Sequence, residues 1–398
     1  MKINIIPLVS ETANEKLSGE FTNKIRENLK GNELFVSSKE SDINLFAIVT
    51  GGTESKFREI FQRFSPPYIL IFNEYNNSLP AAIEILSFLR KNGKDAELID
   101  LKDLSDEFLR KRFPLAGKTI GTIGEPSDWL IASTYSDETF EKTFKIKVKH
   151  IDIKESFEAF EKADAAEAEN LAKDFAKNAG KLIGRDIEDI ARAFKFYIAL
   201  KEIIKRHSLD IISVRCFDII KPLNTTGCIA LSKLNSEGIT ASCEGDLPAA
   251  ISMEVAKIVS GKPGFMANVS YLSDHESGVK VNFAHCTVPV SLVSAYALRT
   301  HFETGKGVGI EGKIGEGDVT VLRIGGKELK EASVATGYAV KTEFSNNRCR
   351  TQLDVEFDKK VKEYFLKNPL GNHHIIIKGD YKKELSEFLT NAGIKVII

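Results

Sequence analysis

The segment with the most chemistry in its side chains is CEGDLPAA, residues 243–250, where two carboxylates, Glu244 and Asp246, flank a glycine. It follows a strand-like run and precedes a run with helical periodicity. Ligands of open α/β sheets bind beside the carboxyl ends of strands, so this junction suits catalysis or metal binding. Asp246 also has the residue type and position of a helix N-cap, which leaves its role open. Glu244 is too early to cap a helix, and a buried carboxylate needs a partner charge or a metal ion.

Nitrogen and amide ligands for such a site occur in later segments. His373 and His374 begin an apolar strand-like run, and consecutive strand residues face opposite sides, so only one histidine points into a given site. A histidine pair by itself is more often structural or exposed than metal-binding. Asn268 and His285 lie inside two further strand-like runs and are candidates to face the same site.

Three other side chains could contact a polyhydroxylated ligand. Trp129, the only tryptophan, lies in a polar loop, where its ring could stack on the apolar face of a sugar or serve as a partly buried anchor. Arg350 and Gln352 stand at the start of a strand and offer hydrogen bonds to hydroxyl groups, although ordinary surface polarity explains them equally well. The glycine-rich stretch 305–317 lies among hairpin patterns, which favours turns over a phosphate-binding loop.

Composition excludes several classes of protein. The 398 residues include 55 Lys+Arg and 56 Asp+Glu, and this balance argues against a general nucleic-acid or membrane-surface binder. No run of about 18 apolar residues predicts a transmembrane helix, and the first residues do not resemble a secretory signal. The five cysteines form no CxxC pair, which predicts reduced thiols in a cytoplasmic protein.

The elements that must position these residues fall into three predicted domains. Residues 1–116 alternate strands and helices, the pattern of a doubly wound parallel sheet. Residues 117–262 repeat this pattern in a second α/β domain that carries Glu244, and we expect one strand over 209–220. Residues 263–398 read as a β-rich, barrel-like C-terminal domain that carries Asn268, His285 and His373.

Four motifs in this order resemble the carboxy-terminal part of the L-fucose isomerase and L-arabinose isomerase superfamily, and in particular its branch of shorter, fucose isomerase-like proteins. The resemblance extends from about residue 118 to the end. It implies a three-domain aldose–ketose isomerase with a divalent metal ion, usually Mn²⁺, at the junction of the second and third domains. It also implies a homo-oligomer, a trimer or hexamer, whose sites borrow residues from a neighbouring subunit. The motifs are CEGDLPAA, FMANVSY, FAHCTVP and GNHHIIIKGD.

The resemblance also assigns roles to residues. Glu244 matches a metal ligand that serves as a base, and His373 matches the ligand histidine. A shift of the match by one residue would place the neighbouring His374 at this ligand position instead. His285 matches an additional histidine ligand of the arabinose isomerase branch. Asn268 stands where the family has a metal-binding aspartate.

Asn268 is a departure with a chemical consequence. Its amide oxygen can still bind a hard cation, but it cannot accept and return a proton. Asp246, His285 or Asp274 would then have to supply the missing base.

Two functions follow as hypotheses. The first is a metal-dependent sugar isomerase that moves a proton between C1 and C2, with Glu244, Asn268 and Asp246 as catalytic residues. In this hypothesis a metal ion is bound by Glu244, Asn268, His373 and His285, and the substrate by Trp129, Arg350, Gln352 and His374. The alternative is a sugar-binding sensor that does not isomerise its ligand, or a different metal-assisted reaction on a sugar-like substrate.

Overall fold

The structure is a computed structural model that describes residues 2–14, 16–37, 39, 41–275 and 278–398. The chain divides into two compact units, Met1–Lys118 with Glu138–Lys147, and Thr119–Asp137 with Val148–Ile398. The domain border expected near residue 262 lies inside the second unit, between a helix and a strand, and stays a prediction. Among the helices of the described ranges, none combines the length and apolarity needed to cross a lipid bilayer.

The first unit is built on a parallel sheet with strand order β2-β1-β3-β4-β5. Alternate residues of its strands enter two separate cores. Ile3 and Ile5 pack with residues of α1 and α4, whereas Leu8 packs with residues of α2 and α3. Helices therefore cover both faces of the sheet, as predicted. The elements are β1 (Lys2–Leu8), α1 (Lys16–Asn28), β2 (Glu33–Val36), β3 (Ile43–Ile48), α2 (Glu54–Ile60), β4 (Tyr68–Phe72), α3 (Ser78–Lys91), β5 (Ala96–Asp100) and α4 (Asp106–Arg112).

The second unit contains a four-stranded sheet of order β10-β9-β6-β7, in which β10, β9 and β6 run parallel. The strand expected over 209–220 is wrong in its second half, because a helix begins at Cys216. This helix buries four residues at helical spacing: Cys216, Ile219, Ile220 and Leu223. In the sequence, the apolar run is too short to distinguish this spacing from the pattern of a buried strand. The elements are β6 (Thr119–Ile123), β7 (Lys147–Ile151), α6 (Ile153–Lys162), α7 (Ala165–Asn178), β8 (Lys181–Ile183), α8 (Ile187–His207), β9 (Ile211–Val214), α9 (Cys216–Leu223), α10 (Cys228–Ser236), β10 (Thr240–Cys243) and α11 (Leu247–Ser260). Helix α5 (Asp137–Phe144) belongs to the first unit except for its first residue.

The remaining strands form the β-rich part that the sequence predicted. Their order is β15-β18-β11-β12-β17-β16, and an additional pairing of β15 with β16 closes the six strands into an antiparallel ring. β19 adds to β16, while β14, β13 and β8 make a separate small sheet. The elements are β11 (Phe265–His275), β12 (Gly278–His285), β13 (Ala295–Arg299), β14 (Gly309–Lys313), β15 (Gly317–Gly325), β16 (Glu331–Val340), β17 (Thr351–Asp358), α12 (Lys359–Lys367), β18 (His373–Lys378), α13 (Lys382–Asn391) and β19 (Lys395–Val396).

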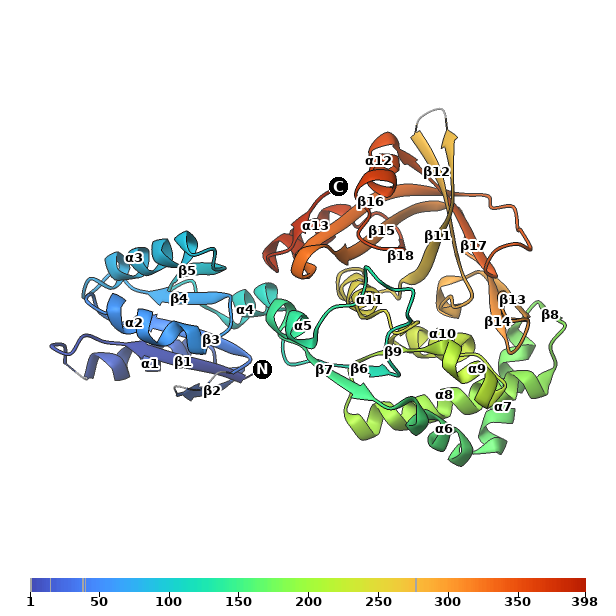
Figure 1. Cartoon of the computed structure of the whole chain (residues 1–398), viewed down its shortest axis with the longest axis horizontal. Helices are drawn as coiled ribbons and strands as arrows, with labels where there is room; N and C mark the ends of the chain where they lie inside the picture. Colours follow the sequence, from blue (N-terminus) through green and yellow to red (C-terminus); the bar gives the residue numbers. More distant parts are fainter. Residues whose placement is uncertain (1, 15, 38, 40, 276–277) are drawn as a thin grey trace. The chain divides into compact units, whose positions relative to one another are not determined.

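Helix α11 packs against both the four-stranded sheet and the ring of the second unit. Its residues from Leu247 to Ala256 are all buried, and it contacts β9 and β10 as well as β15 and β18 (Figure 1). The carboxyl end of β10 and the strands of the ring therefore meet at the start of this helix, where the chemically active residues lie.

Candidate metal centre and its pocket

Glu244 leaves β10 through a tight backbone elbow. Its φ is 64° and that of Gly245 is 72°, so two consecutive residues have left-handed conformations. Gly245 is required because a Cβ there would lie 2.7 Å from the Cα of Pro126. The carbonyl oxygen of Glu244 also accepts a hydrogen bond from the Ser127 amide at 2.9 Å. A positive φ at a non-glycine residue is typical of functional sites, where the surrounding structure enforces it.

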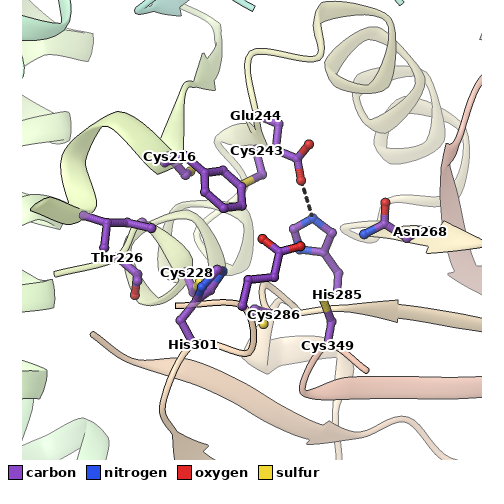
Figure 2. Close-up of a pocket in the computed structure, with 14 residues that line it drawn as sticks. Cys216, Thr226, Cys228, Cys243, Glu244, Asn268, His285, Cys286, His301 and Cys349 are labelled. Atoms are coloured by element: carbon purple, nitrogen blue, oxygen red, sulfur yellow. Dashed lines mark ion pairs between the residues drawn. The ribbon is translucent and has the colours of Figure 1, made fainter. Parts of the chain in front are cut away.

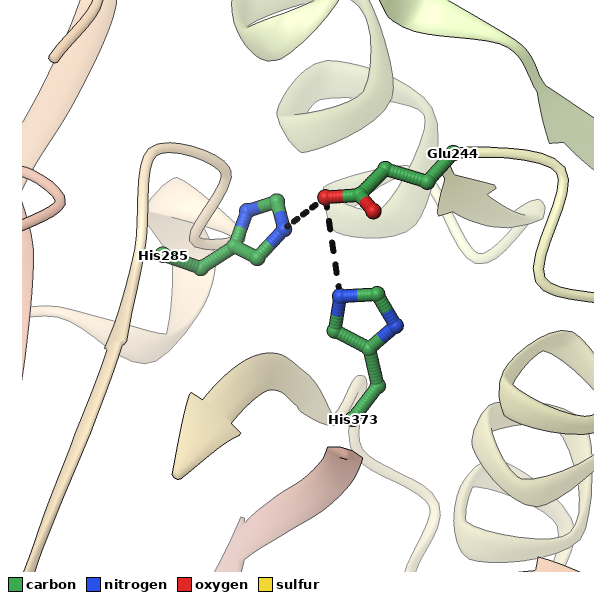
Figure 3. A group of neighbouring side chains, drawn as sticks. All are labelled: Glu244, His285 and His373. Atoms are coloured by element: carbon green, nitrogen blue, oxygen red, sulfur yellow. Dashed lines mark ion pairs between the residues drawn. The ribbon is translucent and has the colours of Figure 1, made fainter. Parts of the chain in front are cut away.

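The Glu244 side chain faces two histidines that come from different strands of the ring (Figure 3). Its Oε1 lies 3.7 Å from Nε2 of His285 and 3.6 Å from Nε2 of His373. One ligand atom from each of the three residues lies within 4.8 Å of the others, and all three are buried. Glu244 and His373, which are distant in the sequence, therefore converge as the sequence predicted.

These residues fit a divalent metal ion. Ligand atoms that share one such ion at about 2.1 Å lie roughly 3–4 Å apart, and both distances from Glu244 to the histidines fall in this range. Among the described residues, the buried Nε2 of His373 has no hydrogen-bond partner, an arrangement that a metal ion would satisfy. One carboxylate and two imidazoles are ligands that divalent transition metals accept.

The charges of the three side chains are strongly coupled. Burial raises the pKa of Glu244, but the adjacent imidazoles of His285 and His373 outweigh burial and hold this pKa well below its ordinary range. Burial lowers the pKa of His373, but Asp246 and Glu244 outweigh burial and raise it to about 9. A bound cation would take the place of the proton on this imidazole.

Asp246 supports the centre from behind His373. Its Oδ2 lies 2.9 Å from Nδ1 of His373, while Oδ1 accepts the Ala249 amide proton at 2.8 Å and so caps α11. Nη1 of Arg323 lies 3.2 Å from Oδ2 of Asp246, and both side chains are fully buried. A carboxylate on the far nitrogen of a histidine fixes the ring and directs the other nitrogen to the metal.

Asn268 lies beside the candidate ligands. It pairs with His373 on one side and with Ala284, the residue before His285, on the other. It also lines the same pocket as Glu244 and His285 (Figure 2). Its side-chain oxygen accepts a hydrogen bond from the amide of Asn372.

Trp129 lies at the centre through a contact that the sequence did not indicate. Its Nε1 donates a hydrogen bond to Oε2 of Glu244 at 2.6 Å, which leaves Oε1 directed to the histidines. The indole ring packs edge-on against Phe217 at 5.0 Å and is 53% exposed. It therefore has both a fixed orientation and a free surface.

The other three predicted substrate contacts lie outside the pocket lining and have protein partners. Nε and Nη2 of Arg350 donate to the carbonyl and hydroxyl oxygens of Thr300 at 2.8 and 3.1 Å. The Gln352 amide bonds the backbone of Ser345. His374 is buried on the opposite face from His373 and lies 2.9 Å from the Tyr364 hydroxyl, and burial lowers its pKa to about 3.

The pocket beside the centre gathers residues that sequence reasoning missed (Figure 2). All five cysteines of the chain line it, although they come from five separate segments. His301 lines it as well, and burial is the main reason that its pKa falls to about 4. Cys243 and Cys286 directly adjoin Glu244 and His285, which is the one signal in the sequence that places thiols here. The lining residues are Cys216, Phe217, Ile220, Thr226, Gly227, Cys228, Cys243, Glu244, Asn268, His285, Cys286, His301, Glu303 and Cys349.

Comparison with known proteins gives one consistent result. No protein-family model matches the chain. The chain is 24% identical over 279 residues to a sulfoquinovose isomerase of Alkalicoccus urumqiensis, an alignment that covers 67% of this chain and 62% of the relative. It is 25% identical over 310 residues to the sulfoquinovose isomerase of Priestia megaterium (strain ATCC 12872 / QMB1551), covering 70% and 64%. The chain thus spans less than two thirds of the length of these relatives, and it is similar to sugar isomerases.

Proposed function

We propose that this protein is a metal-dependent aldose–ketose isomerase of the fucose and arabinose isomerase type that acts on a sugar. The observation that carries the proposal is the buried group of Glu244, His285 and His373 at the edge of a pocket, in which Nε2 of His373 lies near the carboxylate but has no hydrogen-bond partner. The similarity to proteins named sulfoquinovose isomerase supports the same reaction class. We propose Mn²⁺ as the metal ion and the cytoplasm as the location.

The reaction moves the C2 proton of an aldose to C1 and a hydroxyl proton from O2 to O1. A divalent cation held by Glu244, His285 and His373 would polarise the two adjacent sugar oxygens. Trp129 fixes the orientation of Glu244, and its exposed ring offers an apolar surface to the sugar. The Asn268 amide is placed to bind a hydroxyl group, and Asp246 holds the His373 ring in position.

The decisive experiment is a turnover assay on the metal-loaded protein. Metal analysis of the purified protein comes first, followed by a panel of aldoses and ketoses with added Mn²⁺, with sulfoquinovose included because the relatives carry its name. We expect interconversion of at least one pair, with loss of activity on chelation and in Glu244→Gln. Binding of Mn²⁺ without turnover of any sugar would contradict the isomerase proposal.

A second function is favoured by one residue. Asn268 provides no carboxylate at the position where the resemblance expects an aspartate, and a sugar-binding sensor would tolerate this change. The two functions differ in the Glu244→Gln variant. An isomerase loses activity in that variant, whereas a sensor keeps part of its sugar affinity, and calorimetry with the sugar panel measures that affinity.

We also propose that the protein forms a homo-oligomer, a trimer or a hexamer. The loop that carries Trp129 also exposes Ile131, so two large apolar side chains, 53% and 89% accessible, lie two residues apart on a surface that another copy would cover. Sedimentation analysis at micromolar concentration tests this proposal, and a monomer would contradict it.

A further inference from the structure

An isomerase needs a group that takes a proton from carbon and returns it, and the structure accounts for each candidate named from the sequence. Asp246 is fully buried between Arg323 and His373. The Asp274 side chain is 78% exposed and pairs with Lys362. His285 faces Glu244 with one nitrogen and contacts the Thr287 hydroxyl with the other, at 2.8 Å. None of the three is free to carry a proton in the pocket.

We propose that Glu303 is the catalytic acid–base residue that moves the proton between C2 and C1 of the sugar, an inference that rests on the proposed isomerase function. Glu303 lines the pocket together with Glu244, Asn268 and His285. Glu244 and Glu303 are the two carboxylates among the lining residues. Glu303 is outside the close group of candidate ligands.

The loop that carries Glu303 is anchored at both ends. It connects β13 to β14, and Arg350 holds its first residue through the two hydrogen bonds to Thr300. At the other end, the Thr226 hydroxyl donates to the Val308 carbonyl at 2.7 Å and accepts from the Val308 amide at 3.0 Å. Catalytic groups must be held close to their productive geometry, and these anchors provide that restraint.

Bonds within the loop restrain it further. The His301 amide donates to the carbonyl of Lys306 and the Gly305 amide donates to that of His301, each at 3.0 Å. Gly307 packs so closely on Thr226 that a Cβ there would lie 2.6 Å from its methyl carbon. Arg350 therefore contributes to the site by positioning this loop, a role that differs from the substrate contact predicted for it.

The surroundings of Glu303 suit proton transfer. Burial raises its pKa above the ordinary value, the negative charge of Glu244 raises it further, and the charge of His285 opposes both. By accessible surface the residue is exposed, so its burial is partial and the proton that it carries can exchange with water.

The proposed step conserves atoms and electrons. In the aldose-to-ketose direction the Glu303 carboxylate accepts the C2 proton, the C–H electron pair forms the C1–C2 double bond, and the carbonyl electrons move to O1. The Glu303 carboxylic acid then returns the proton to C1 as the C2 carbonyl forms. O1 gains one proton and O2 loses one, so the product is an isomer of the substrate.

Glu303→Gln tests the proposal because it keeps the shape of the side chain and removes the proton carrier. We expect kcat to fall about 10²–10⁴-fold, the contribution of a positioned acid or base, with KM changed less than threefold. Mn²⁺ affinity should stay that of the wild type. The matched control is Glu316→Gln, an exposed glutamate outside the pocket lining, which should retain wild-type kcat.

Two further readouts separate a proton carrier from a structural residue. In D₂O the wild type should incorporate deuterium at C2 of the aldose and C1 of the ketose, and Glu303→Gln should not. The activity of Glu303→Ala should be partly restored by added formate, which supplies a carboxylate in the vacated space.

Three outcomes would overturn the inference. Wild-type kcat in Glu303→Gln would show that another group carries the proton. Loss of Mn²⁺ affinity in that variant would make Glu303 a metal ligand. A wild-type protein that binds Mn²⁺ but turns over no sugar would reject the proposed function itself, and with it this role, and that result is recognised before any variant is made.

Discussion

At the scale of single residues, the charge of the centre is set by one side chain. Asn268 lies between the strands that carry His373 and His285, where the resemblance expects an aspartate. The candidate centre consists of Glu244, His285, His373 and Asn268, and Glu244 is the only one of these four side chains that carries a negative charge. Hard-cation affinity rises with the number of charged ligands, so this position controls how tightly an ion such as Mn²⁺ is held.

Asn268→Asp should tighten Mn²⁺ binding because it adds a second carboxylate without changing side-chain size. The Asn372 amide can donate to the new carboxylate as it does to the present amide oxygen, so the local structure should persist. Calorimetric titration measures the change. Asn178→Asp adds the same charge on α7, outside the pocket lining, and should leave affinity unchanged. An equal or weaker affinity in Asn268→Asp would show that Asn268 does not face the bound ion.

At the scale of elements, the predictable part of the site was the junction of β10 and α11. A strand-like run, two carboxylates and a helix-like run identify a strand that ends at a helix N-cap, and Asp246 does cap α11. The pairing of His373 with Asn268 required the ring of strands to be known, because register between distant strands leaves no local pattern. Glu303 was missed because it stands in a turn of small and polar residues, and its place in the pocket depends on Thr226 and Arg350.

Arg323, on β15, pairs with the buried Asp246 carboxylate, and a substitution of Arg323 tests how far the centre depends on this pair. Arg323→Met should destabilise the fold by about 3–5 kcal/mol, because it leaves the fully buried Asp246 carboxylate without its cation. Mn²⁺ affinity should also fall about 10–100-fold, since the orientation of His373 depends on Asp246.

Chemical denaturation measures the first effect and calorimetry the second. The double variant Arg323→Met/Asp246→Asn should recover part of the stability by removing the unpaired charge, but it should not recover Mn²⁺ affinity. Unchanged stability in Arg323→Met would mean that His373 alone balances the charge of Asp246.

At the scale of the whole molecule, every residue of the candidate centre lies in the second unit. The carboxyl end of β10 supplies Glu244, and the neighbouring ring strands β18, β11 and β12 supply His373, Asn268 and His285. The closed ring holds the last three at fixed spacing, because a ring strand cannot slide without breaking pairs on both sides. The fold class was predictable in outline, whereas this closure depends on the β15–β16 pairing.

Mn²⁺ should therefore slow hydrogen exchange in selected segments. We expect protection around 243–250, at the end of β12 and at the start of β18, because the ion binds the folded centre and opposes its local opening. Amides of β1, β3 and β4 in the first unit should exchange at the same rate with and without the ion. Uniform slowing across both units would contradict a site confined to the second.

The five cysteines that line the pocket can report whether a ligand is bound there. Each alkylated thiol adds a fixed mass, so an intact-mass spectrum after brief treatment with iodoacetamide counts how many thiols remain reachable. Cys349 is the most accessible of the five, and the other four are buried along the pocket wall. A sugar that binds beside these thiols should lower the count whether or not it is converted. Compound collections can therefore be screened for ligands of an unknown specificity without a turnover assay, and without a single substitution in the chain.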